Sequence, residues 1–165
     1  MSTSVHFEQT ERELVSRDER RIRDTIAALH RAHLKHDAPA ATALYAEDAE
    51  VFNLAPPLIH QGVNVEEKQA WMDSWATPIE IVPRDLKITV GGDFAFARCL
   101  LQMSGTKKGA EGAVRFWMRG TMEFERIRGS WRIVHEHTSV PFYMDGSFRP
   151  AFDLEPERGR EGQAA

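Results

Sequence analysis

Two patterns of apolar residues divide the chain into a helical first half and a strand-rich second half. From Asp18 to Lys35 apolar residues recur every three or four positions against arginines and histidines, which predicts an amphipathic helix with Asp18 as its cap. Shorter helices are predicted at Ala40 to Tyr45 and Glu66 to Trp75, with a strand at Glu50 to Asn53 between them.

After Pro83 apolar residues alternate with polar ones, which is typical of half-buried strands. Turns that contain glycine or serine separate the strands, so we expect neighbouring strands to pair antiparallel. Helices followed by a run of strands predict an α+β fold, with helices covering one face of a curved sheet. The four predicted strands are Asp85 to Val90, Phe94 to Gly105, Val114 to Arg126 and Trp131 to Val140.

The composition is that of one globular domain. The chain has 165 residues and a formal charge of -4 at pH 7, which argues against a nucleic-acid or anionic-membrane partner. The sequence has one cysteine, no apolar secretory signal and no window apolar enough to span a membrane. We expect a cytoplasmic protein with a flexible arm at residues 1–17, a domain at 18–145 and a loose tail at 146–165.

The last predicted strand carries the side chains that most suggest chemistry. Because side chains alternate across a strand, Ile133, His135 and His137 should share one face while Glu136 and Thr138 share the other. Burial among apolar side chains would raise the pKa of Glu136 toward neutrality and suit it to general acid/base catalysis. The alternative interpretation is that Glu136 pairs with an arginine and has a structural role.

A set of apolar and sulfur-containing side chains is expected around Glu136. Alternation on the two middle strands gives most of the set, and the i, i+4 spacing of two tryptophans gives the rest. Such residues are typical of a plain core and also of a ligand pocket. The candidate ligand-binding residues are Trp71, Trp75, Cys99, Leu101, Met103, Met118, Met122 and Thr138.

Histidines in two places raise the question of a metal site. His30, His33 and His36 lie three apart on the first predicted helix, and without a carboxylate or cysteine at ligand spacing we interpret them as a solvated helix face. His135 and His137 would need a third ligand from another strand or subunit, so we interpret them as hydrogen-bonded histidines in an interface. We expect no metal and no cofactor.

Parts of the chain resemble a known family. The segments Tyr45 to Leu58, Gly92 to Ala97 and Gly129 to Phe142 resemble the ketosteroid isomerase homologues of the nuclear transport factor 2-like, SnoaL-like superfamily, over about Asp18 to Asp145. The resemblance implies a cystatin-like cone, in which a curved antiparallel sheet wraps round a long N-terminal helix. It also implies a pocket at the wide end of the cone and a homodimer through the convex sheet face.

The resemblance assigns side chains to the two faces of the sheet. The residues expected to point into the cone are Asn53, Cys99, Leu101, Met122, Val134, Glu136 and Thr138. Those expected to face the partner subunit are His135, His137, Trp117 and Arg119.

The best-known chemistry of the superfamily does not carry over to this chain. In ketosteroid isomerases an aspartate base works with a tyrosine and a neutral aspartic acid, and the corresponding positions here are Asn53, Leu29 and Met122. None of these can take its assigned role. The arginines of the similar association domain of calcium/calmodulin-dependent kinase fall at Leu101, Met122 and Thr138, which argues against anion binding of that kind.

We therefore expect a homodimer that binds a small, largely apolar molecule. Glu136 would act as general acid/base, with Asn53 in its hydrogen-bond network, in an isomerase, cyclase or dehydratase reaction. The main alternative is a non-catalytic dimerisation or ligand-sensing module, and a metal-dependent enzyme that uses the strand histidines is a third hypothesis. An open cavity beside Glu136 favours the first hypothesis, whereas a cavity filled by methionine and tryptophan side chains favours the second.

Overall fold

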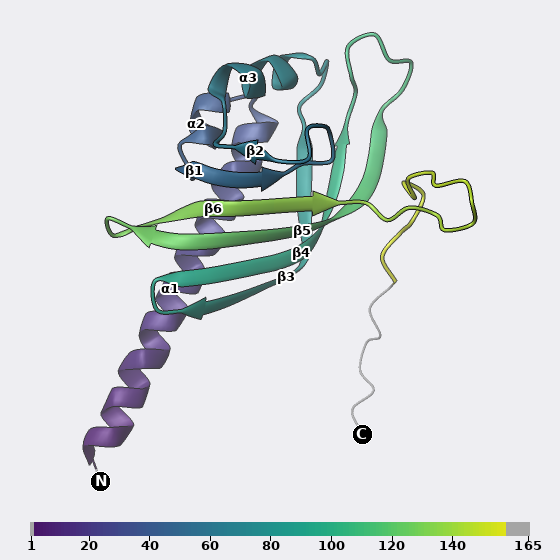
Figure 1. Ribbon diagram of the computed structural model, residues 1–165. Helices are drawn as coiled ribbons and strands as arrows, with labels where there is room; N and C mark the ends of the chain where they lie inside the picture. The colour runs from purple at the N-terminus through teal and green to yellow at the C-terminus, as the bar shows by residue number, and fades with distance from the viewer. Residues whose placement is uncertain (1, 158–165) are drawn as a thin grey trace.

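The α+β architecture is a long helix packed against one curved sheet, with two short helices at one end (Figure 1). The computed structural model describes residues 2–157, with side chains from Arg12 onward. The six strands form one sheet in the order β2-β1-β6-β5-β4-β3. The elements are α1 (Ser2–Leu34), α2 (Ala38–Thr42), β1 (Tyr45–Phe52), β2 (His60–Gln61), α3 (Val65–Asp73), β3 (Glu80–Gly91), β4 (Phe94–Gly105), β5 (Val114–Ile127) and β6 (Ser130–Ser139).

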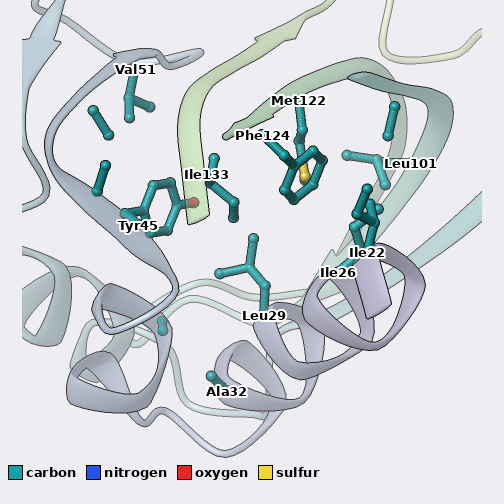
Figure 2. Close-up of a cluster of buried hydrophobic side chains, with 14 of the residues drawn as sticks. Ile22, Ile26, Leu29, Ala32, Tyr45, Val51, Leu101, Met122, Phe124 and Ile133 are labelled. Atoms are coloured by element: carbon teal, nitrogen blue, oxygen red, sulfur yellow. The ribbon is translucent and has the colours of Figure 1, made fainter. Parts of the chain in front are cut away.

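Helix α1 crosses the concave face of the sheet and supplies one side of the core. Its apolar stripe of Ile22, Ile26 and Leu29 is buried, and Figure 2 shows these side chains pointing toward Phe124 and Ile133 of the sheet. Full burial of an aliphatic side chain of this size stabilises the fold by about 1.5–3 kcal/mol. The predicted amphipathic helix is therefore confirmed, although it begins at Ser2 and includes most of the predicted arm.

Asp18 lies inside α1, which begins at Ser2, so it does not cap the helix, and its carboxylate pairs instead with an arginine of the sheet. Its two carboxylate oxygens accept hydrogen bonds of 3.2 and 2.7 Å from Arg126, and Trp131 Nε1 lies 3.4 Å from Oδ1. The Arg126 hydrogen bonds hold the pKa of Asp18 below its ordinary value. This buried pair ties the middle of α1 to the β5–β6 hairpin.

The sheet is mixed, so the expectation of an all-antiparallel layout is wrong for one pair of strands. β1 and β6 run parallel, with Val51 opposite Glu136 and Tyr45 opposite Ile133. Parallel neighbours need a long connection, and here α3 and the β3–β4–β5 meander provide it. This pairing brings the start of β1 beside the residues of β6 that the sequence marks as chemically interesting.

A β-bulge changes the direction of side chains on β6. Met122 pairs with Glu136, but Phe124 pairs with Ile133, so β6 has one more residue than β5 at this point. The extra residue places Ile133 and Glu136 on the same side of the sheet, although they are three positions apart. Ile133 is fully buried at 0 % exposure, and its predicted place on the same face as the strand histidines is wrong.

Several element boundaries also differ from the predicted ones. Tyr45 begins β1 instead of ending a helix, because α2 ends at Thr42. The edge strand β3 begins at Glu80 and tolerates Pro83, since an edge position does not require every backbone donor. α3 begins at Val65 after Asn64, whose side chain accepts a hydrogen bond of 2.9 Å from Glu67 N.

The C-terminal segment, expected to be loose, makes defined contacts as far as Glu157. Ala151 is buried, and Phe152 lies 4.7 Å from Phe116 between ring centroids. Glu155 accepts a hydrogen bond of 2.7 Å from Trp117 Nε1. The rest of the predicted tail, residues 158–165, lies outside the described residues.

Candidate functional site

A cavity of about 440 Å³ lies between α1, α3 and the concave face of the sheet. Its walls are mostly apolar, with a few polar and charged side chains among them. This composition is that of a small-molecule site, in which apolar walls hold a ligand and a few polar groups orient it. The predicted site residues that line it are Asn53, Trp71, Trp75, Leu101, Met103, Met118, Glu136 and Thr138.

Two predicted ligand-binding residues do not line the cavity. Met122 is buried in the core, where Figure 2 shows it beside Phe124. Cys99 is half-buried on the neighbouring strand, and burial, together with the charge of Glu136, raises the pKa of its thiol to about 11. Cys99 is therefore a protonated thiol at neutral pH and a poor nucleophile.

The partner of Glu136 is a tyrosine that the sequence analysis did not select. The Tyr45 hydroxyl donates a short hydrogen bond to Oε2 of Glu136. Tyr45 is buried, and this burial and the nearby carboxylate raise its pKa well above the ordinary value, so the phenol stays protonated and donates. Among the described residues Oε1 has no hydrogen-bond partner, which leaves one carboxylate oxygen for a ligand.

Among the described residues, Glu136 bonds to neither of its two expected partners, Asn53 and an arginine. Within the described part of the chain Asn53 and Glu136 share no hydrogen bond, although both line the cavity. Arginine does not pair with Glu136 either, since every ion pair of the described residues involves other carboxylates. Glu136 is thus held by a neutral phenol, which orients the carboxylate without neutralising it.

Lys68 on α3 is the positively charged group of the cavity wall, and it lies next to Glu67 of the same helix, which also lines the cavity. Lys68 Nζ lies 5.7 Å from the centroid of the Tyr45 ring. Burial lowers the pKa of Lys68, and the charge of Glu136 partly opposes this effect. The cavity wall therefore carries an ammonium group on α3 and carboxylates on both α3 and β6.

Two of the helix histidines also belong to the cavity, so their interpretation as a solvated face is wrong. His33 is buried, and its Nδ1 lies 2.8 Å from the Leu29 carbonyl oxygen. A carbonyl only accepts, so Nδ1 carries the proton and Nε2 is left as an acceptor. Burial lowers the pKa of His30 to about 4 and that of His33 to about 3, and both rings are neutral at physiological pH.

Aromatic side chains form one wall of the cavity. Trp71 and Trp75 meet edge to face at 6.0 Å between ring centroids, and His33 meets Trp71 in the same way at 5.9 Å. Within the described residues Trp75 Nε1 is buried without a hydrogen-bond partner. These contacts fix the rings in place before any ligand binds.

The strand histidines lie away from this site. His135 and His137 pack against Phe52, with ring centroids at 4.7 and 5.5 Å. On the same outer face Arg119 Nε donates a hydrogen bond of 3.1 Å to Ser139, and Trp117 contacts the C-terminal segment. Among the described side chains, no group of three His, Cys, Asp or Glu residues is placed to hold a metal ion.

The sequence contains a signal for one missed residue. Lys68, Trp71 and Trp75 follow one another at i, i+3 and i+7, so the lysine shares the face of the tryptophans. Tyr45 carries no comparable signal, because its meeting with Glu136 depends on the parallel β1–β6 pair.

Comparison with known proteins identifies the family. The model of the SnoaL-like domain matches residues 22–143, which is most of the chain. The chain belongs to the SnoaL-like domain family. No curated protein matches this SnoaL-like protein in sequence.

Solved structures agree with the SnoaL-like assignment. An NTF2-like protein of unknown function from Pseudomonas putida KT2440 is 28% identical with a TM-score of 0.75, covering 86% of this chain and 98% of that one. An NTF2-like protein with a cystatin-like fold from Novosphingobium aromaticivorans is 24% identical with a TM-score of 0.65, covering 89% and 94%. A candidate dehydratase of the NTF2-like family from Streptomyces avermitilis is 18% identical with a TM-score of 0.65, covering 75% and 96%. The cystatin-like cone predicted for this SnoaL-like protein is confirmed.

Membrane insertion through a helix is not indicated. Across residues 2–157, none of the helices combines the length and the apolar character needed to cross a bilayer.

The buried histidines predict a pH dependence of stability. The unfolded chain binds a proton at His33 near its ordinary pKa of 6.5, whereas the folded chain does so only near 3, so lowering the pH between these values destabilises the fold. We expect a slope of about 1.4 kcal/mol per pH unit from His33. Urea unfolding of the wild type and His33→Gln from neutral pH to pH about 4 measures it, and the variant should have the shallower slope. Equal slopes would contradict the burial of a neutral His33.

Proposed function

We propose that the cavity binds a small, largely apolar molecule and that Glu136 acts on it as a general acid/base. The reaction would be an isomerisation, cyclisation or dehydration, each of which needs a proton moved at one position of the substrate. The observation that carries the proposal is the Tyr45–Glu136 hydrogen bond at the wall of an open cavity.

The unfilled volume of the cavity favours catalysis or ligand binding over a purely structural role. Met118 and Trp75 line the cavity without filling it, and Met122 lies in the core beneath. A volume of about 440 Å³ is within the range that suits a small organic ligand. A module that only dimerised would gain packing energy from filling this space.

The two oxygens of Glu136 suit separate tasks. Oε2 accepts from Tyr45, which fixes the plane of the carboxylate, while Oε1 is left for the proton of a substrate. A fixed base reacts faster than a mobile one because its orientation is already determined. Tyr45 is thus a positioning residue, and Glu136 is the proposed catalytic residue. Asn53, also on the wall, remains a candidate for orienting the substrate.

The names of similar structures agree with this class of reaction. The structure from Streptomyces avermitilis is named as a candidate dehydratase, and another from Novosphingobium aromaticivorans as a candidate scytalone dehydratase. Dehydration next to a carbonyl requires a base at the C–H and an acid at the departing hydroxyl, and a carboxyl group can serve as either.

Substitution of Glu136 tests the catalytic role. A substrate is first selected from small apolar carbonyl and hydroxyl compounds by the rise in Tm that each produces. Glu136→Gln keeps the shape of the side chain and removes the base, so we expect kcat/KM to fall roughly 100- to 10,000-fold. Tyr45→Phe should lower kcat more than it raises KM, because it removes only the orienting hydrogen bond.

A carboxylate on the other face of the sheet provides the matched control. Glu123 is exposed on β5 and pairs with His135 across the strands. Glu123→Gln should therefore keep wild-type turnover. Unchanged turnover in Glu136→Gln, with the fold intact by circular dichroism, would remove Glu136 from the mechanism.

The outer face of the sheet supports the second expectation, a homodimer. Phe94 and Phe96 on β4 are 63% and 42% exposed, while the alternate residues Ala95 and Ala97 are buried. Neighbouring exposed aromatic side chains on one sheet face favour contact with another apolar surface. A second copy of the chain presents the same face and pairs with it by two-fold symmetry.

Sedimentation of a charged variant tests the homodimer. The double variant Phe94→Asp, Phe96→Asp places charges at the proposed contact, so we expect it to sediment as a monomer where the wild type sediments as a dimer. Leu58→Asp is the control, since Leu58 is 92% exposed in the β1–β2 loop, at the sheet edge opposite β4 and β3. A wild-type monomer, or a double variant that stays dimeric, would contradict this interface.

A further inference from the structure

Lys68 defines the chemical class of the ligand more narrowly than the apolar walls do. We propose that the molecule bound in the cavity carries a carboxylate, which pairs with Lys68, on an otherwise aromatic or alicyclic body. The inference rests on the proposed function, because it assumes that the cavity is a ligand site.

The ammonium group of Lys68 lacks a polar partner among the described residues. In this part of the chain the ammonium nitrogen makes no hydrogen bond and no ion pair, and it lies 5.7 Å from the centroid of the Tyr45 ring. Lys68 is half-buried and lines a cavity with mostly apolar walls. An ammonium group in such a place is destabilising unless an anion or several acceptors satisfy it.

Glu136, the carboxylate whose charge acts on Lys68, already has a hydrogen-bond partner. The charge of Glu136 acts on the pKa of Lys68, yet the two side chains form no ion pair within the described part of the chain. Oε2 of Glu136 accepts from Tyr45 instead. The two opposite charges therefore line the same cavity from different elements, Lys68 from α3 and Glu136 from β6, without pairing with each other.

A carboxylate suits the ammonium group of Lys68 better than a neutral acceptor does. A neutral carbonyl would accept one hydrogen bond and leave the positive charge uncompensated, whereas a carboxylate supplies both charge and acceptors. The neighbouring His33 and His30 are neutral, so they do not compete as cations for that carboxylate. The like charge of Glu136 directs the carboxylate to the Lys68 wall and leaves the rest of the ligand beside Glu136.

The helix that carries Lys68 also supports an aromatic or alicyclic body. Trp71 follows Lys68 by three residues and lines the same cavity, and its ring is fixed against Trp75 and His33. A planar or ring-shaped body packs on such a wall while its carboxylate reaches the lysine.

Two matched probes separate the roles of charge and of the apolar body. We would measure Kd by isothermal titration calorimetry for 2-naphthoate and for the neutral 2-naphthalenemethanol. The wild type should bind naphthoate about tenfold more tightly or better, since charge-assisted pairing in an apolar site exceeds a neutral contact. In Lys68→Met this preference should disappear, with the affinity for the alcohol unchanged within about twofold.

Two further variants complete the experiment. Lys68→Arg keeps the charge and should keep a preference for naphthoate. Lys87→Met removes a lysine that is exposed on β3, so it should behave as the wild type. A preference that survives in Lys68→Met, or that falls equally in Lys87→Met, would overturn the assignment to Lys68.

The neutral probe keeps the two proposals distinguishable. If the alcohol binds and naphthoate binds no better, the apolar site stands and the carboxylate anchor is wrong. If neither probe binds at millimolar concentration, the ligand cavity itself is contradicted and the inference fails with it.

Discussion

The site depends on one irregular backbone feature, the extra residue in β6 between Ile133 and Glu136. Without it, a strand whose Ile133 fills the core would direct Glu136 to the outer face, because side chains alternate. The bulge allows the strand to contribute to the core at its start and to the cavity further along. The parallel neighbour β1 then supplies Tyr45 at the position where the carboxylate enters the cavity.

The cavity wall is built from segments of α1, α3 and the sheet. These segments meet because α1 packs against the sheet and also lines the cavity. Its apolar stripe packs against the sheet, while His30 and His33, further along, face the cavity. The Asp18–Arg126 pair fixes the helix along its length relative to the β5–β6 hairpin. Because packed cores deform little, this arrangement keeps the positions of the cavity residues constant.

Much of this could be predicted from the sequence, and the failures have physical causes. The amphipathic period of α1 and the alternation on β4 and β5 follow from burial along each single element. The inner-face positions predicted for Leu101, Met103 and Met118 are therefore confirmed. The bulge and the parallel β1–β6 pair depend on contacts between segments far apart in the chain. Local patterns therefore do not predict the face of the sheet on which Ile133 lies, or the role of Tyr45. The prediction for His33 is wrong because a histidine fits both a solvated face and a buried wall, and only the tertiary contacts with α3 distinguish them.

The carboxylate of Glu136 lies on the concave face of the sheet, and its charge acts on the pKa of the Cys99 thiol. Its pKa of about 11 has two causes, burial and the negative charge of Glu136. Titration of the thiolate by its ultraviolet absorbance in the wild type and in Glu136→Gln separates them. The structure predicts a pKa near 11 in the wild type and a clearly lower value in the variant, still above the ordinary 9.0 because burial remains. The same pKa in both proteins would mean that Glu136 points away from the cavity.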